Sequence, residues 1–237
     1  MIIAILDHRA DLDLVGAKVY SQAKHGRDVG ALVGRDPVGV LATCDAADAI
    51  AMEADCVLYT PRITDLDEVC AILASGKNVA TTAFLFHPQR MPAADRDRLI
   101  AACEQGESSV HGSGLNPGNL SGVLPLALSG MSRTIDRVTL QERADWSVYE
   151  STAITFDSMA FGQPVEQISP TAGEFLTFNS SIFTEQVWFI ADALNAGIDE
   201  VTATVEAVAA RSKLASERKC TRIEGSPSMV SVQPSFG

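Results

Sequence analysis

Three consecutive segments decide the fold: ADCVLYTP (residues 54–61), TDLDEVCAILASG (64–76) and NVATT (78–82). The first is an apolar run that stops at Pro61, which has no backbone N–H for a strand ladder, so we predict a buried strand. The second begins with a capping-box pattern in an acid-rich turn and ends at Gly76, as a helix does. The third is a second strand. A strand, a helix and a strand in this order predict a parallel sheet with crossover helices.

The same alternation continues on both sides of these segments. A polar stretch punctuated by glycines, which we interpret as a loop, separates the first predicted strand from the second predicted helix. The flanking predictions are helices over 1–8, 45–52 and 92–105 and strands over 12–20 and 108–111.

The order of these elements differs from that of a doubly wound nucleotide-binding domain, because such a domain begins with a strand. Burying one large aliphatic side chain contributes about 1.5–3 kcal/mol, so losing the four or five of a central strand approaches the roughly 5–15 kcal/mol of net stability of a domain. We therefore expect residues 1–118 to form an incomplete Rossmann-type α/β domain whose first strand and glycine-rich turn are missing.

The second half of the chain changes character near residue 119. Apolar patterns predict helices over 120–128 and 174–194, and the period-two alternation of 135–142 predicts a half-exposed strand, with another strand over 201–208. We therefore expect an α+β substrate and oligomerisation domain over 119–210.

The last segment, residues 211–237, has five basic residues, two acidic ones and six serines in an otherwise acidic chain. Its composition predicts a disordered tail outside the fold, and a basic interaction tail is the alternative.

Composition excludes several classes of partner. The net charge of −12 and the pI of about 4.7 disfavour nucleic acid and anionic membrane surfaces. The apolar N-terminus lacks a basic region, so we do not predict a signal peptide, and no apolar run reaches the roughly 18 residues that cross a bilayer. Five scattered cysteines without ligand spacing suit reduced thiols, so we expect a cytoplasmic protein without a metal site.

The turn GSGLNPG (112–118) follows a predicted strand, which makes it a candidate phosphate loop. Its spacing fails because Pro117 stands where a phosphate loop needs glycine, and proline also removes a backbone donor. It suits better a hinge that leaves the nucleotide domain, in which the Asn116 side chain can hydrogen-bond a ligand and Gly118 permits close backbone approach.

Five motifs occur in order: VLYTP (57–61), GKNVATT (76–82), GSGLNPG (112–118), LPLALSG (124–130) and FDSMAFG (156–162). Together they resemble the dihydrodipicolinate reductase-like amine dehydrogenases of actinobacterial type, the group that includes 2,4-diaminopentanoate dehydrogenase. The resemblance covers about residues 1–210. It implies a Rossmann domain for NAD(P)H, a second domain for substrate and oligomer contacts, and hydride transfer at the C–N or C=N carbon of an amino-acid-like substrate.

The same resemblance implies cofactor-binding positions. Two would lie beside the diphosphate and ribose, and the others would flank the nicotinamide at strand ends, where open α/β sheets bind ligands. These positions are Thr60, Pro61, Thr81, Thr82, Asn116 and Pro117. The chain departs from the family because it lacks the initial G-x-G-x-x-G turn and the roughly hundred further residues of intact, homo-oligomeric members.

The residues after the 12–20 strand bear on the choice of cofactor. NAD enzymes usually place an acid there for the ribose 2′-hydroxyl. This chain has Ser21 and Lys24, with Arg27 nearby, which favours the 2′-phosphate of NADP; solvated loop charges are the alternative.

The candidate acid and base residues are His111, His87 and Glu142. Both histidines follow strand ends, and a structural role is the alternative for each. Glu142, with Asp145, Trp146 and Tyr149, could surround an ammonium group, and an exposed charged surface is the alternative. The lysine-bearing, histidine-rich motif of true dihydrodipicolinate reductases is absent, so that reaction is not assigned.

Three functional hypotheses follow. The chain is an amine-type oxidoreductase, an inactive truncated remnant, or a binding module completed by a partner that donates a strand. Losing three charge-assisted phosphate bonds of roughly 1.5–3 kcal/mol each weakens binding about a thousandfold or more, so we expect weak NAD(P)H binding by the isolated chain.

Overall fold

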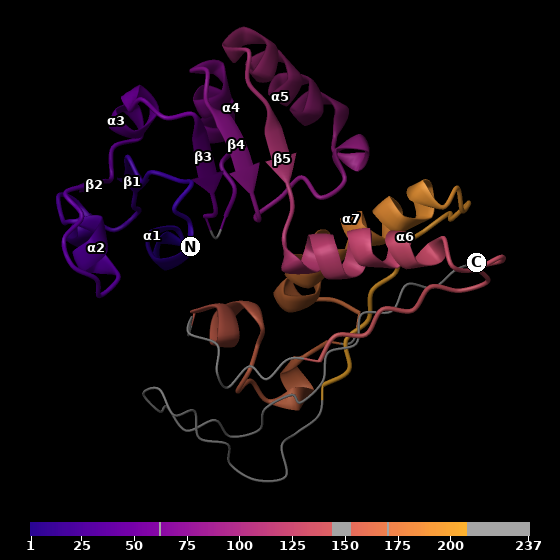
Figure 1. The fold of residues 1–237 in the computed structure, drawn as a ribbon. Coiled ribbons are helices and arrows are strands. Elements are labelled where there is room, and N and C mark those ends of the chain that lie inside the picture. Colours follow the sequence, from indigo (N-terminus) through magenta and orange to yellow (C-terminus); the bar gives the residue numbers. More distant parts are fainter. Residues whose placement is uncertain (62, 144–152, 170, 208–237) are drawn as a thin grey trace. The chain divides into compact units, whose positions relative to one another are not determined.

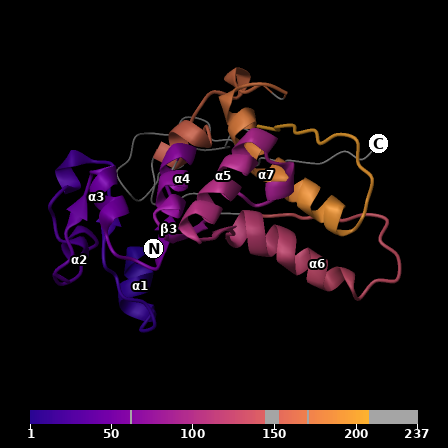
Figure 2. The same ribbon diagram turned by 90° about the horizontal axis from the view of Figure 1, so that it is seen from above.

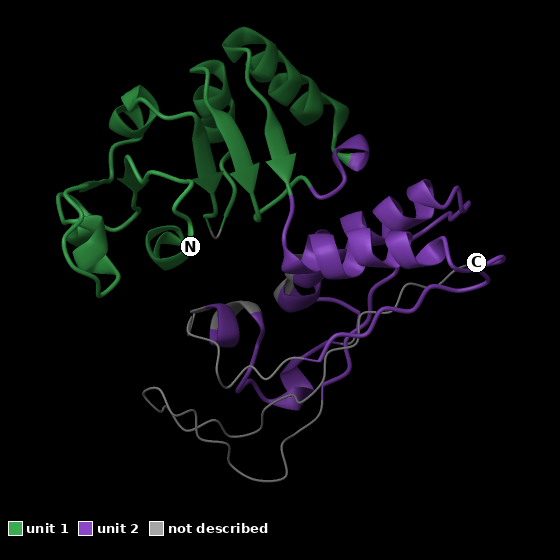
Figure 3. Ribbon diagram, viewed as in Figure 1, with its two compact units in different colours: residues 1–85, 91–112 green, residues 86–90, 113–237 purple. Residues whose placement is uncertain are grey.

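The computed structural model describes residues 1–61, 63–143, 153–169 and 171–207 (Figure 1). The chain forms two compact units (Figure 3): unit 1 comprises Met1–Leu85 and Met91–Gly112, and unit 2 comprises Phe86–Arg90 and Ser113–Gly237. The predicted tail and three of the candidate amine-binding side chains (Asp145, Trp146 and Tyr149) lie outside the described residues.

The main sheet of unit 1 confirms the predicted parallel α/β class. Strands β3 (Cys56–Tyr59), β4 (Asn78–Thr81) and β5 (Val110–Gly112) pair in this order, all parallel. Tyr59 is the register partner of Thr81, which in turn pairs with Gly112. The three strands therefore end together at one edge.

Helices α4 (Leu66–Ala74) and α5 (Ala93–Gly106) connect these strands and lie side by side, as the view from above shows (Figure 2). The Asp65 carboxylate caps α4 by accepting hydrogen bonds from the N–H groups of Asp67 and Glu68 at 3.0 and 3.2 Å. The cap is thus Asp65, one residue after the threonine that begins the predicted capping box. The buried core of the sheet and its helices is Tyr59, Val69, Ile72, Leu73, Val79, Leu85, Leu99 and Ala102.

A glycine sets the distance between the two helix ends. A Cβ on Gly106 would lie 2.0 Å from the carbonyl oxygen of Leu73, so only glycine allows the end of α5 to approach the end of α4 this closely. Gly76 has a φ of +91° just after α4, which is the left-handed conformation that the sequence predicts there.

A second, two-stranded sheet holds β1 (Ala17–Lys18) and β2 (Ala42–Thr43), also parallel. The predicted strand over 12–20 forms only at Ala17 and Lys18, because β2 offers only two partners for a ladder. The rest of that prediction is wrong. The preceding helix α1 (Ile2–His8) and the following helix α3 (Ala46–Ala51) agree with the prediction.

The glycine-punctuated stretch before β2 is more ordered than a loop. It contains helix α2 (Val29–Leu32), which the sequence analysis missed. The Asp28 carboxylate accepts hydrogen bonds from the N–H groups of Gly30 and Gly39, both at 2.8 Å. Hydrogen bonds to one carboxylate thus organise the segment without any apolar periodicity.

The sheet of unit 1 is divided. In the part of the chain that the structure describes, β1 and β3 form no ladder with each other, so the parallel strands belong to two sheets.

Unit 2 is built on helix α7 (Glu174–Ala193), which agrees with the prediction. It also holds the segment Leu115–Val123, labelled η3 here, whose backbone is not helical at Asn116, Pro117 and Gly118, and helix α6 (Leu124–Ser129). Its shorter helical turns are Pro88–Arg90, Ala153–Ser158 and Val165–Gln167.

The two strands predicted for the second half are wrong. Residues 135–142 and 201–207 are extended or irregular and form no ladder with any described residue. Alternating polarity gives a segment two faces but does not supply the partner strand that hydrogen-bonds to it. The described part of unit 2 is therefore helical, without the predicted β component.

Candidate functional site

The carboxyl ends of β3 and β4 place two threonine hydroxyls on one edge of unit 1. Tyr59 and Thr81 are register partners, and Thr60 and Thr82 are the residues that follow them. The two following threonines, Thr60 and Thr82, are exposed. Pro61, next in the chain, is half-buried. This edge is where a parallel α/β sheet binds ligands, so the first four predicted cofactor positions lie together.

The turn after β4 is held in an unusual conformation. Thr81 is buried, and its hydroxyl oxygen accepts a hydrogen bond from the N–H of Ala83 at 3.0 Å. Leu85 has a φ of +67°, a left-handed conformation that costs a non-glycine residue about 1–3 kcal/mol and concentrates at functional sites. A Cβ on Gly112 would lie only 2.3 Å from the Leu85 carbonyl oxygen, so the end of β5 supports this turn.

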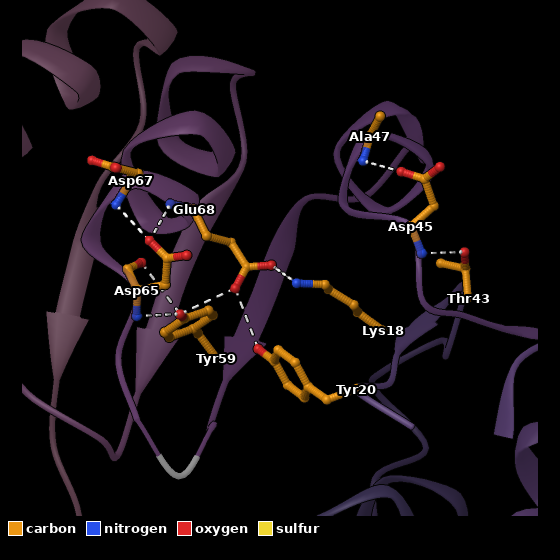
Figure 4. A network of polar contacts seen from close by, with 9 residues as sticks. All are labelled: Lys18, Tyr20, Thr43, Asp45, Ala47, Tyr59, Asp65, Asp67 and Glu68. Atoms are coloured by element: carbon orange, nitrogen blue, oxygen red, sulfur yellow. Dashed lines mark hydrogen bonds and ion pairs between the residues drawn. The ribbon is translucent and has the colours of Figure 1, made fainter. Parts of the chain in front are cut away.

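A buried carboxylate organises the end of β1 (Figure 4). Glu68, in the first turn of α4, forms an ion pair with Lys18 of β1. Its other oxygen accepts hydrogen bonds from the hydroxyls of Tyr20 at 3.3 Å and Tyr59 at 3.2 Å. Asp65 extends the network because its N–H donates to the Tyr59 hydroxyl at 3.0 Å. The network joins the ends of β1 and β3 across the division of the sheet.

The other predicted residues of unit 1 are on the surface. A short 3-10 turn, Gln22–Lys24, follows β1; Ser21 precedes it and Lys24 is its last residue. The side chains of Ser21 and Lys24 are both exposed. His111 is the middle residue of β5, where it pairs with Ala80, and its side chain is also exposed. The exposure of these side chains leaves them accessible to a ligand.

Unit 2 contains the Asn116–Pro117 part of the predicted site, joined by a cis peptide bond. The Asn116 amide donates a hydrogen bond to the carboxylate of the exposed Glu142, and Pro117 is buried. The side-chain carbonyl oxygen of Asn116 is buried and has no hydrogen-bond partner among the described residues. The N–H of Gly118, at a φ of +129°, donates to the buried Gln186 of α7 at 3.0 Å. A polar acceptor without a partner is costly to bury, so this oxygen is a candidate ligand contact.

His87 is occupied by contacts within unit 2. Its Nε2 lies 2.8 Å from a carboxylate oxygen of Asp192 on α7, and its ring edge meets Phe189. Arg90 donates to both oxygens of Asp192, at 2.9 and 2.6 Å, and its guanidinium lies 4.1 Å from the Trp188 ring centroid. Hydrogen bonds from Arg90, and then from His87, hold the pKa of Asp192 well below its usual range. This histidine therefore has the structural role that was its alternative.

The comparisons with known proteins give the chain a relative. No family model matches the sequence. The chain is similar to an amine dehydrogenase of Streptomyces virginiae, with 31% identity over 205 residues that cover 81% of this chain and 55% of the relative. The chain spans about half the length of that curated relative.

The fold is shared with a solved structure. The structure of an amine dehydrogenase from Mycobacterium smegmatis superposes with a TM-score of 0.75 at 17% identity, covering 97% of this chain and 68% of that one. At this identity the match shows the shared fold alone, which is the arrangement of parallel strands and helices that the sequence predicts.

Two further observations concern the residues that the structure describes. In the described ranges, no group of three or more histidine, cysteine or acidic side chains is placed to hold a metal ion. No helix in these same ranges is both long enough and apolar enough to cross a bilayer.

Sequence reasoning missed Glu68, Tyr20 and Asp192. The signal that could have found Glu68 is its position on the apolar stripe of a helix, four residues before the buried Ile72. Asp192 is half-buried on α7, next to the buried Ala191. An acid at such a position has to find a cation or donor, because burying an unpaired charge is expensive.

Proposed function

We propose that this chain is an NAD(P)-dependent oxidoreductase of the dihydrodipicolinate reductase-like type, acting on the C–N bond of an amino-acid-like amine. The observation that carries the proposal is the row of strand ends in unit 1. Two exposed hydroxyls at the ends of adjacent parallel strands, beside a strained turn, form the kind of edge that binds a dinucleotide in such sheets.

The residues of unit 1 fit the two nucleoside ends of a nicotinamide cofactor. Thr60 and Thr82 can donate to or accept from ribose hydroxyls, since both hydroxyls are exposed. Gly112 lets the chain pass against the turn after β4 without a side chain in the way. Lys24, in the turn after β1, would hold a 2′-phosphate and so favour NADP. When bound, such a cofactor would supply a hydride acceptor or donor for the C–N carbon.

The residues of unit 2 suit a protonated amine. The partnerless side-chain oxygen of Asn116 can accept a hydrogen bond from an ammonium group. Glu142 accepts from the Asn116 amide, which fixes the orientation of that oxygen, and its negative charge favours a cation nearby. The chain's own groups would thus bind and orient the substrate nitrogen.

Ligand-observed saturation-transfer NMR with NADH and NADPH tests the cofactor assignment, because the method detects binding as weak as millimolar. We expect transfer to both cofactors. Removing one hydroxyl in Thr60→Val or Thr82→Val should weaken binding by about threefold to tenfold.

The matched control is Thr134→Val, an exposed threonine of unit 2, which should bind as the unaltered chain does. Absence of transfer to either nucleotide would overturn the proposed function.

The divided sheet supports a second candidate, a binding module that accepts a strand from a partner polypeptide. β1 and β3 make no ladder with each other in the described residues, so a parallel strand between them would pair with both. Size-exclusion chromatography with light scattering distinguishes the two functions: a hetero-complex of defined stoichiometry supports the module, and a single species of this chain alone argues against it.

A further inference from the structure

Tyr20 combines exposure with fixed orientation. It stands two residues after β1, and 67% of its surface is exposed, although its hydroxyl is held inside the polar network of Figure 4. An exposed tyrosine usually gains nothing from being held in one rotamer, because ordering a side chain costs entropy. A held aromatic face is what a ligand ring needs.

Two contacts fix the ring. The hydroxyl donates to Glu68, 3.3 Å away, and the Lys18 ammonium lies 4.6 Å from the ring centroid. The cation occupies one face of the ring. The exposure of the residue leaves the other face to solvent.

The position of the ring coincides with a ligand-binding edge. The carboxylate oxygen of Glu68 that accepts from Tyr20 also accepts from Tyr59, the last residue of β3. Tyr20 is therefore tied to the carboxyl ends of both β1 and β3. Ligands of open α/β sheets bind at that edge.

The charges of Lys18 and Glu68 bear on which part of a ligand the Tyr20 ring would contact. Lys18 and Glu68 form an ion pair, so together they present no net charge to a phosphate. Burial of the hydroxyl, and next the negative charge of Glu68, raise the pKa of Tyr20, so the phenol stays neutral. An uncharged flat surface favours an uncharged heteroaromatic ring.

We infer that Tyr20 is the stacking platform for the adenine ring of a nucleotide, with Lys18 and Glu68 as the residues that position it. The inference rests on the proposed function, since it names the surface that takes the adenosine end of the cofactor. The inference assigns adenine recognition to Tyr20, which precedes the Ser21–Lys24 turn. The basic side chain of Lys24 in that turn remains available for a 2′-phosphate.

Titration of the full chain with AMP, followed by saturation transfer to the adenine protons, tests the inference. Base–aromatic stacking contributes about 1–3 kcal/mol, so Tyr20→Ala should weaken AMP binding by about tenfold to a hundredfold. Tyr20→Phe keeps the ring and should stay within about threefold of the unaltered chain. The control Ile63→Ala removes an equally exposed apolar side chain of unit 1, 80% exposed, and should change nothing.

The outcomes separate the two claims. If the unaltered chain binds NADH or NADPH and Tyr20→Ala binds AMP equally well, the inference is wrong and the proposed function stands. If the unaltered chain binds none of the three nucleotides, both are wrong. If Tyr20→Ala lost saturation transfer on the nicotinamide protons of NADH but kept it on the adenine protons, the assignment to adenine would also be wrong. Circular dichroism confirms that each variant is folded.

Discussion

The sheet of unit 1 and helix α7 of unit 2 are stabilised in different ways. Around β3 and β4 the core is apolar, and Val69 and Leu73 of α4 have no exposed surface. Helix α7 also buries apolar side chains (Leu176, Ile190 and Ala191), but it buries polar ones beside them, with Asn179 and Gln186 each 4% exposed. Burial of apolar area holds the first region, and directed hydrogen bonds add to it in the second.

The difference extends to what each region positions. The apolar core of unit 1 sets the register of the strands and so aligns the threonines at their ends. On α7, Glu185 accepts from the N–H groups of Phe86 and His87 at 2.9 and 3.0 Å, and Gln186 accepts from Gly118. Hydrogen bonds are directional, so these contacts can hold irregular segments that apolar packing alone would leave free to shift.

The apolar side of the comparison predicts the largest effect. Leu73→Ala leaves a cavity in a fully buried position and should lower the free energy of unfolding by about 2–5 kcal/mol. Urea denaturation followed by circular dichroism measures it. Ile63→Ala, 80% exposed, is the control and should change the free energy of unfolding by less than about 0.5 kcal/mol. Equal effects of the two substitutions would show that α4 does not pack as described.

The polar side of the comparison predicts a smaller effect from a substitution that keeps side-chain volume. Gln186→Met removes the acceptor for the Gly118 N–H and leaves that donor without a partner, which should cost about 1–3 kcal/mol. Trp fluorescence during denaturation reports it. The exposed Gln167→Met is the matched control. A Gln186→Met protein as stable as the control would show that apolar packing, and not hydrogen bonding, holds the η3 segment to α7.

The same contrast explains which parts of the fold could be predicted from the sequence. Helices α4, α5 and α7 and strands β3 and β4 have apolar patterns or end signals within their own residues, and their predictions are confirmed. The strand over 12–20 shrinks to Ala17–Lys18, and those over 135–142 and 201–208 do not form, because a strand also needs a partner that local periodicity does not encode.

The residues of the candidate site also differ in whether the sequence predicts them. Motifs and strand ends identify Thr60 and Thr82, and the structure places them on adjacent strand ends. Glu68 meets Lys18 across 50 residues of sequence, and Asp192 meets His87 across 105. Tertiary packing brings the members of such pairs together, so a local pattern can mark a buried acid but cannot predict the residue that it meets.

The smallest predicted effect concerns the pH dependence of the polar region. Because Arg90 and then His87 hydrogen-bond to Asp192, the pKa of this carboxyl in the folded chain lies below its ordinary value of 3.8. A lowered pKa means that the contribution of Asp192 to stability is present above about pH 3.8 and is lost as the pH falls through the folded-state pKa. Asp192→Asn should therefore be less stable than the unaltered chain at neutral pH, with a difference that shrinks in acid. Urea denaturation at a series of pH values measures both proteins. A difference that stays constant down to pH values near 3.8 and below would show that the charge of Asp192 contributes nothing and that its hydrogen-bond geometry alone holds the His87 segment to α7.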